Sequence, residues 1–103
     1  MVVLGIDPGL ATLGVLAGGV LILILDAACG RQKLLAYGCI LTTPEQTFPD
    51  RLLAIQTETG ELLSRFHPDE IAFEELFFAR NVTTALTVGA ARGVCVAVCA
   101  AYT

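Results

Sequence analysis

The stretch PDEIAFEELFFARN, Pro68–Asn81, decides the fold, because it places a short apolar segment between two segments with helical patterns. The apolar part, Ile71–Phe73, is too short for a helix and predicts a strand. A strand that follows a helix usually runs parallel to an earlier strand, through a right-handed crossover. The stretch therefore predicts a mixed α/β layer structure.

The segment before this stretch predicts an amphipathic helix. Pro49 suits the first helical turn, and Pro68 lies just beyond the end. Gly60 inside the helix costs about 1 kcal/mol relative to alanine. The residues on one helical face are Leu52, Ile55, Thr59, Leu62, Leu63 and Phe66.

The beginning of the chain predicts an antiparallel meander. Val2–Ile6 is expected to end as a strand at Asp7-Pro8-Gly9, because proline lacks an N–H and glycine tolerates positive φ. Thr12–Leu25 continues as one strand, or as two strands joined by a turn at Gly18-Gly19. After a turn, Leu34–Thr42 is expected to form another strand, and the short connections favour antiparallel pairing.

The uncharged run Leu13–Leu25 is also the one segment that suggests a membrane. A spanning helix needs about 20 apolar residues. This run stops at Asp26, contains two glycines and is rich in Val, Ile and Leu. A buried strand is the favoured interpretation, and no membrane partner is expected.

The end of the chain predicts a helix over Thr84–Ala100, capped by Asn81 or Thr83. Gly89 and Gly93 are four residues apart, so small residues on one face allow close packing against a sheet or another helix. The order of three strands, a helix, a strand and a helix indicates a single domain over residues 1–103.

The composition fits a small folded domain and gives little sign of nucleic-acid binding by overall charge. Of 103 residues, 55% are hydrophobic and 16% are charged, which excludes disorder. Six basic and ten acidic residues give a net charge of −4, so the usual basic field is absent. A local site that uses metal ions stays possible.

The cysteines give no sign of a zinc site. Cys29, Cys39, Cys95 and Cys99 form no CxxC pair, and His67 is the one histidine. A zinc site needs about four converging ligands at recognisable spacings. We expect buried free thiols in a reducing, cytoplasmic environment.

Two carboxylates stand at the ends of predicted strands. Asp7 follows one apolar strand and Glu74 follows another. If these strands are parallel neighbours, their backbones lie about 4.8 Å apart and both acids project from one edge of the sheet. Such a pair suits Mg²⁺, which takes oxygen ligands. The alternative is an Asx-turn at Asp7 and a solvated Glu74.

Aromatic and basic residues follow the second of these acids. Phe77 and Phe78 are adjacent, so in an extended segment at least one is expected to project outward. It could stack on unpaired bases, or both rings could cover the sheet edge or a subunit interface. Arg80 and Arg92 are available for phosphates.

The sequence closely resembles the RuvC family of Holliday junction resolvases. The matching motifs are GIDPG at Gly5–Gly9, PDEIAFEELFFARN at Pro68–Asn81 and NVTTALTVGAARGV at Asn81–Val94, with LLAYGCILT at Leu34–Thr42 and the helix after it. GIDPG alone is weak, because sugar-kinase-like ATPases also open with a strand and an Asp-x-Gly corner. Glu74–Val94 is far more specific.

The resemblance implies an RNase H-like mixed sheet of three antiparallel strands and a parallel strand with flanking helices, here truncated before the last strand and helix. It implies a homodimeric endodeoxyribonuclease that cuts four-way junction DNA in recombination and repair, together with branch-migration motor proteins. It also implies two Mg²⁺ ions, with Mn²⁺ as a substitute. A two-metal site activates water and stabilises the leaving oxygen.

The resemblance also assigns residues. Asp7 and Glu74 match the first two of four catalytic, metal-binding carboxylates. Phe77 matches the aromatic that stacks on bases at the opened centre of the junction. The basic and polar positions expected to contact DNA are Arg80, Asn81 and Arg92.

The chain departs from the family in its acids. The third and fourth family carboxylates are late aspartates, whereas no Asp or Glu follows Glu75 here. By position, Asp26, Asp50 and Asp69 cannot replace them. The domain is therefore expected to be C-terminally incomplete, and these 103 residues inactive or nearly so. Gly14–Gly30 is also longer and more apolar than the corresponding stretch of family members. It is either an extended hairpin or an irregularity of the sequence.

Two other functions stay open. One is a fragment of a sugar-kinase-like or actin-like ATPase, which does not explain Glu74–Val94. The other is a non-catalytic paralogue that binds junctions without cutting them. Low charge argues against tight binding by such a paralogue, since affinity rests largely on phosphate neutralisation.

Overall fold

The described part of the chain forms a four-stranded mixed sheet and two helices. The computed structural model describes residues 1–8, 18–28, 30–43, 45–73 and 82–102. The elements in chain order are β1 (Val2–Pro8), β2 (Gly18–Ala28), β3 (Arg31–Thr42), α1 (Phe48–Phe66), β4 (Glu70–Phe73) and α2 (Val82–Tyr102). This order confirms the predicted succession of strands and helices.

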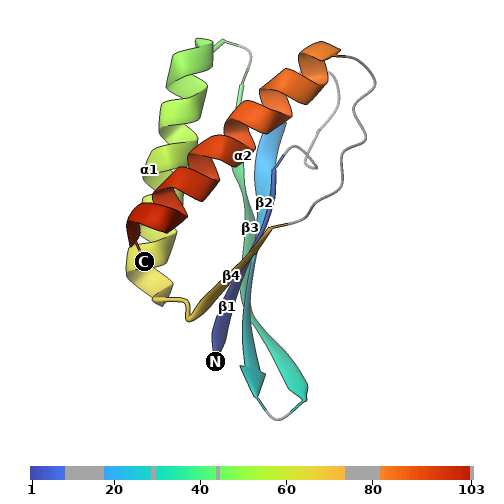
Figure 1. Ribbon diagram of the computed structural model, residues 1–103, viewed down its shortest axis with the longest axis vertical. Helices are drawn as coiled ribbons and strands as arrows, with labels where there is room; N and C mark the ends of the chain where they lie inside the picture. Colours follow the sequence, from blue (N-terminus) through green and yellow to red (C-terminus); the bar gives the residue numbers. More distant parts are fainter. Residues whose placement is uncertain (9–17, 29, 44, 74–81, 103) are drawn as a thin grey trace.

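The strand order is β3-β2-β1-β4. β1, β2 and β3 pair antiparallel, whereas β4 lies parallel to β1. Both helices cover one face of the sheet, and α2 crosses in front of the sheet in Figure 1. The predicted parallel strand after α1 is therefore confirmed, and the crossover connection through α1 creates it.

The core lies between the sheet and the helices. Alternate residues of the central strands face it, because successive side chains of a strand point to opposite faces. The buried apolar residues are Leu4, Ile6, Val20, Ile22, Ile24, Ile40, Ile55, Leu63, Cys95 and Cys99. On the other face of the sheet Leu23, Tyr37 and Leu41 are exposed. Within the described part of the chain, this second face has no covering layer.

Helix α1 begins and ends where local chemistry predicts. The Thr47 side chain accepts a hydrogen bond from the Asp50 backbone N–H at 3.2 Å, which is an N-cap. His67 follows the helix in the left-handed region with φ of 46°, and its N–H donates to the Leu63 carbonyl at 3.0 Å. The predicted apolar stripe is confirmed, since Ile55 and Leu63 are buried.

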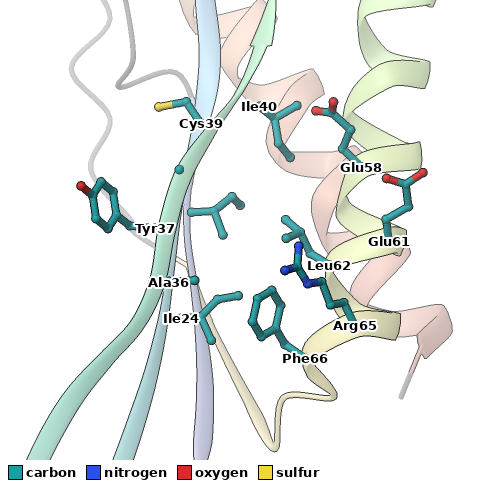
Figure 2. Close-up of a pocket in the computed structure, with 12 residues that line it drawn as sticks. Ile24, Ala36, Tyr37, Cys39, Ile40, Glu58, Glu61, Leu62, Arg65 and Phe66 are labelled. Atoms are coloured by element: carbon teal, nitrogen blue, oxygen red, sulfur yellow. The ribbon is translucent and has the colours of Figure 1, made fainter.

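Between α1 and β3 the core opens into a pocket with a volume of about 390 Å³ (Figure 2). Its β3 side is formed by Ala36–Ile40, and Leu62 and Phe66 reach toward it from α1. Helix α1 therefore leaves the outer edge of the sheet partly uncovered.

Several strand boundaries differ from prediction. β1 does not end at Ile6 but continues to Pro8, which pairs with Val20. The fixed φ of proline fits extended backbone, and β1 has already lost its β4 neighbour at that point, since the last pair is Ile6 with Phe73. Gly18-Gly19 does not form a turn, because both residues pair with β3 inside β2.

The described part of the apolar run lies in β2, the first strand of the long hairpin of β2 and β3. Ala28 pairs with Arg31, so the turn has two residues, and Gly30 takes the positive φ of 77° that favours glycine. Strand β3 thus begins at Arg31, three residues before the predicted Leu34. None of the described helices is long and apolar enough to cross a membrane.

Helix α2 begins earlier and packs differently than predicted. It starts at Val82, so Thr83 lies inside the helix and cannot cap it, and Asn81 lies outside the described residues. Gly89 and Gly93 are exposed, and a Cβ on either would meet nothing within 4 Å. Within the described residues, neither glycine packs closely against the sheet or α1. Among the α2 side chains that the structure describes, those of Cys95 and Cys99 are buried in the core.

The free thiols are only partly buried as predicted. Cys95 lies in the core with its sulfur 3.9 Å from the Thr59 hydroxyl, and Cys99 is also buried. Cys39 is exposed, because it lies on the sheet face away from the helices. Cys29 lies outside the described residues.

Candidate active site

The candidate site lies at the carboxyl ends of β1 and β4. The parallel pairs run from Val3 with Glu70 to Ile6 with Phe73. The carboxyl ends of both strands therefore lie at the same end of the sheet. Asp7 comes next on β1, and its backbone pairs with Leu21 on the other side. Glu74 is the next residue after β4 and lies outside the described residues. The predicted strand arrangement behind the acidic pair is therefore confirmed.

Arg92 on α2 lies against the last residue of β4. Its guanidinium carbon is 5.6 Å from the centroid of the Phe73 ring, which is a cation–π distance. Its Nε is buried and has no hydrogen-bond partner among the described residues. The other residues predicted to contact DNA, Phe77, Arg80 and Asn81, lie outside the described residues.

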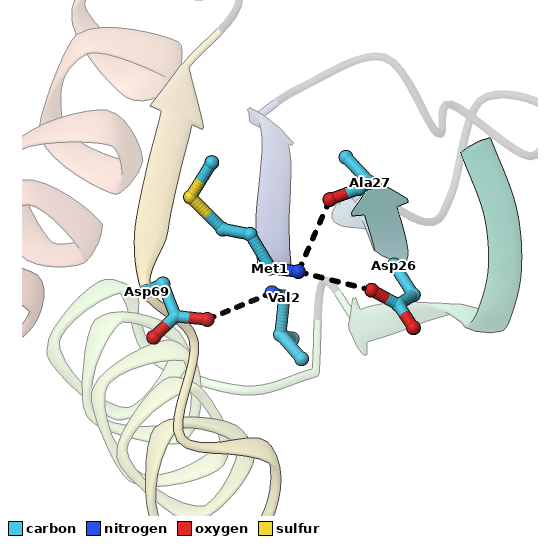
Figure 3. Close-up of polar contacts among 5 residues, drawn as sticks. All are labelled: Met1, Val2, Asp26, Ala27 and Asp69. Atoms are coloured by element: carbon cyan, nitrogen blue, oxygen red, sulfur yellow. Dashed lines mark hydrogen bonds and ion pairs between the residues drawn. The ribbon is translucent and has the colours of Figure 1, made fainter. Parts of the chain in front are cut away.

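Two further aspartates lie at the opposite end of β1 (Figure 3). The Met1 ammonium donates to Asp26 Oδ1 and to the Ala27 carbonyl, both at 3.1 Å. Asp69 Oδ2 accepts a hydrogen bond from the Val2 backbone N–H at 2.8 Å. Asp26 and Asp69 therefore hold the first residues of the chain, at the end of β1 away from the predicted acidic pair.

Metal ligands are sparse in the described residues. In that part of the chain no group of three or more His, Cys, Asp and Glu side chains could hold a metal ion. The predicted pair, Asp7 and Glu74, consists of two acids, so it has fewer members than such a group. Carboxylate oxygens are the ligands that Mg²⁺ prefers. The donor chemistry of the predicted pair thus fits a magnesium ion that keeps most of its water.

Sequence reasoning missed the contact between Phe73 and Arg92. A cation–π pair between β4 and α2 depends on how the helix packs against the sheet, which no local pattern reveals. The one sequence signal is the position of Phe73, an aromatic residue immediately before the predicted acid.

Comparison with protein families and sequences gives a consistent match. The family described as crossover junction endodeoxyribonuclease RuvC matches residues 3–102. The RuvC of Finegoldia magna is 49% identical over 94 residues, which cover 91% of this chain and 53% of that protein. The RuvC of Thermomicrobium roseum is 42% identical over 101 residues, covering 96% of this chain and 56% of that protein.

Solved structures match over almost the whole chain. T. thermophilus RuvC in complex with a Holliday junction substrate has a TM-score of 0.84 and 28% identity, covering 99% of this chain and 61% of that one. A second Thermus thermophilus RuvC structure has a TM-score of 0.74 and 30% identity. The sheet and its helices thus have an RNase H-like arrangement. The chain spans about half the length of the curated relatives it matches.

Proposed function

Since the chain belongs to the RuvC family, we propose that this protein acts in the metal-dependent hydrolysis of phosphodiester bonds at four-way DNA junctions, as a structure-specific endodeoxyribonuclease of recombination and repair. The observation that carries the proposal is the parallel register that ends with Ile6 opposite Phe73. It supports a catalytic pair formed by the next residue of each strand.

The catalytic pair that we propose is Asp7 and Glu74. Consecutive Cα atoms are about 3.8 Å apart and paired strands about 4.8 Å apart, so the two residues that follow this register come close together.

Mg²⁺, with Mn²⁺ as a possible substitute, is the metal that we propose for this pair. When bound, two ions would activate a water molecule and stabilise the leaving oxygen. Asp7 and Glu74 would supply carboxylate oxygens, and substrate phosphate and water would fill the other positions. No acid follows Glu75, so two carboxylates stand where the family uses four. We therefore propose that the 103-residue chain alone cleaves weakly or not at all.

For DNA contacts we propose Phe77, Arg80, Asn81 and Arg92. The ring of Phe77 would stack on an unpaired base, which is worth about 1–3 kcal/mol per base. Arg80 and Asn81 would contact phosphates. Arg92 lies beside the carboxyl end of β4 and has no described anionic partner, which supports a contact with phosphate.

We also propose a cytoplasmic homodimer that works with branch-migration motor proteins. The exposed side of α2 supports a dimer, since it is small and uncharged at Gly89, Gly93, Val96 and Ala97. An uncharged helix face fits a second copy of the chain better than it fits a phosphate backbone. The free thiols of the described cysteines suit a reducing compartment.

A junction-binding experiment tests the proposal. A labelled synthetic four-way junction and a duplex of equal length are titrated with the chain in Ca²⁺, and Mn²⁺ binding is measured separately by calorimetry. We expect a preference for the junction. We also expect weak Mn²⁺ binding that Asp7→Asn or Glu74→Gln removes and Asp69→Asn leaves unchanged, because Asp69 lies at the opposite end of β1.

Each outcome has a definite meaning. Equal affinity for junction and duplex would contradict the proposal. Robust paired nicking in Mg²⁺ by this chain would contradict its predicted inactivity. Junction binding without Mn²⁺ binding, unaffected by Asp7→Asn, would favour the non-catalytic paralogue. The ATPase alternative is not retained, because the family match covers residues 3–102.

A further inference from the structure

The outer edge of β3 is open. β3 is at one end of the strand order and pairs with β2 on its inner side. Along Ala36–Ile40, none of the backbone hydrogen bonds outside the regular elements reaches this edge from another described residue. An exposed strand edge presents unpaired N–H and C=O groups, which form a template for another strand.

The usual protection of an edge strand is missing from this part of β3. Proteins block edges with lysine, proline, bulges or a covering element. In β3 the lysine, Lys33, and the bulge beside Leu34 lie in the first third of the strand. Ala36–Ile40 contains no charge, no proline and no register shift. The unprotected part of the β3 edge is therefore Ala36–Ile40, the segment that lines the pocket.

The pocket beside this edge has an apolar floor and a charged rim. Its volume is about 390 Å³, and Ile24, Ile40 and Leu62 form part of its floor. In Figure 2, Phe66 and Arg65 reach from α1 toward β3, whereas the Tyr37 and Cys39 side chains point away to the other face. A strand added to β3 would therefore place alternate side chains in this groove.

The charges of the rim are separated along the groove. Glu58 lies near Ile40, at the end opposite Phe66 (Figure 2), and Glu61 follows it on α1. Neither carboxylate forms an ion pair with another described residue. Arg65 lies at the other end, with its guanidinium carbon 5.2 Å from the Phe66 ring centroid. The groove thus has an acidic end and a basic end.

From these features we propose that the groove between β3 and α1 binds an extended peptide segment of another protein by strand addition. The segment runs antiparallel to β3, with a basic residue near Glu58 and Glu61, β-branched apolar residues over the floor, and an acidic residue near Arg65. This is a recognised mode of peptide binding, in which main-chain bonds give affinity and alternate side chains give specificity. The inference does not depend on the proposed nuclease function.

A synthetic peptide tests the proposal. The probe is acetyl-Lys-Thr-Val-Thr-Val-Thr-Asp-amide, and the control is the same peptide with proline in place of the central threonine, because proline removes a ladder N–H. We expect the probe to bind and to slow hydrogen exchange at the backbone amides of Ala36–Ile40. Glu58→Gln with Glu61→Gln should weaken binding about 2- to 30-fold, from two exposed charge interactions.

The matched control variant is Glu70→Gln, an exposed carboxylate on the far edge of the sheet, and it should leave the affinity unchanged. The absence of binding, or equal binding of the proline peptide, would overturn the proposal. A dimer in sedimentation that the peptide dissociates would place a second copy of the chain on β3. This result would also overturn the proposal. Slower exchange on β4 instead of β3 would place the peptide elsewhere and reject this groove.

Discussion

The buried thiols of Cys95 and Cys99 are expected to make stability depend on pH. Burial raises the pKa of Cys95, against a hydrogen bond to Thr59 that lowers it. Burial, and next the charge of Cys95, raises the pKa of Cys99 from 9.0 to about 11. As pH rises, the unfolded chain loses these protons first, so the free energy of unfolding should fall between about pH 9 and 11. Urea unfolding at several pH values measures this fall.

The control for this prediction is a pair of single variants. Cys99→Ala should flatten the fall above pH 9, whereas Cys39→Ala, at an exposed thiol, should keep the wild-type slope. If the curves of all three proteins run parallel from pH 8 to 11, the buried thiols do not carry the dependence.

Arg92 is expected to lower stability in return for function. An unmade hydrogen bond of a buried group costs about 1–3 kcal/mol, whereas a cation–π contact returns about 0.5–1 kcal/mol at an exposed site. Arg92→Met keeps the contact with the Phe73 ring and removes the unpartnered Nε. It should raise the free energy of unfolding by up to about 1 kcal/mol and weaken junction binding.

Arg65→Met is the matched control, because Arg65 stacks on Phe66 in a similar way at the far end of α1. It should leave junction affinity unchanged. A loss of stability in Arg92→Met together with unchanged binding would show that Arg92 serves the fold and not DNA.

At the scale of elements, Gly60 limits the stability of α1. It lies inside the helix, and a Cβ there would meet nothing within 4 Å. Gly60→Ala should therefore raise the free energy of unfolding by about 1 kcal/mol, the helix-propensity difference. Gly30→Ala should do the opposite, since Gly30 has a φ of 77° in the hairpin turn. Thermal or urea unfolding distinguishes the two, and a stabilising Gly30→Ala would contradict the argument.

The elements were predictable from apolar periodicity, and their ends were not. Ile55 and Leu63 recur at helical spacing, which is sufficient to place α1 and its buried face. Pro8 and Gly18 are residues that local rules assign to turns, but pairing with a neighbouring strand keeps both in the sheet. Gly89 shows the same limit, because small residues allow close packing without requiring it.

At the scale of the whole molecule, the uncovered sheet face is expected to promote association between molecules. Leu23, Tyr37 and Leu41 are 39%, 76% and 50% exposed, so large apolar side chains lie in solvent on one face. Exposed patches of this kind promote aggregation. Tyr37→Lys with Leu41→Lys should delay the onset of light scattering on concentration and leave the unfolding midpoint nearly unchanged. Leu63→Lys, inside the core, is the contrasting variant and should unfold the protein.

The candidate site was predictable only in outline. An acid at the end of an apolar run occurs twice in the sequence, and the parallel register of β1 and β4 confirms that these two strands are neighbours. The contact of Arg92 with Phe73 was out of reach, because it joins a helix and a strand whose packing angle no local pattern encodes.

The hydrogen bond from Val2 to Asp69 joins residues 67 positions apart. During synthesis, β1 leaves the ribosome early, but its parallel neighbour follows only after the hairpin and α1 have been made. Hairpins close in about 1–10 μs, whereas a distant pairing must also overcome the entropy of closing a long loop. The pairing of β4 with β1 is therefore expected to form later than the β2–β3 hairpin. Substitutions in β4 should therefore lower the yield of folded chains during translation more than they lower the stability of the folded protein.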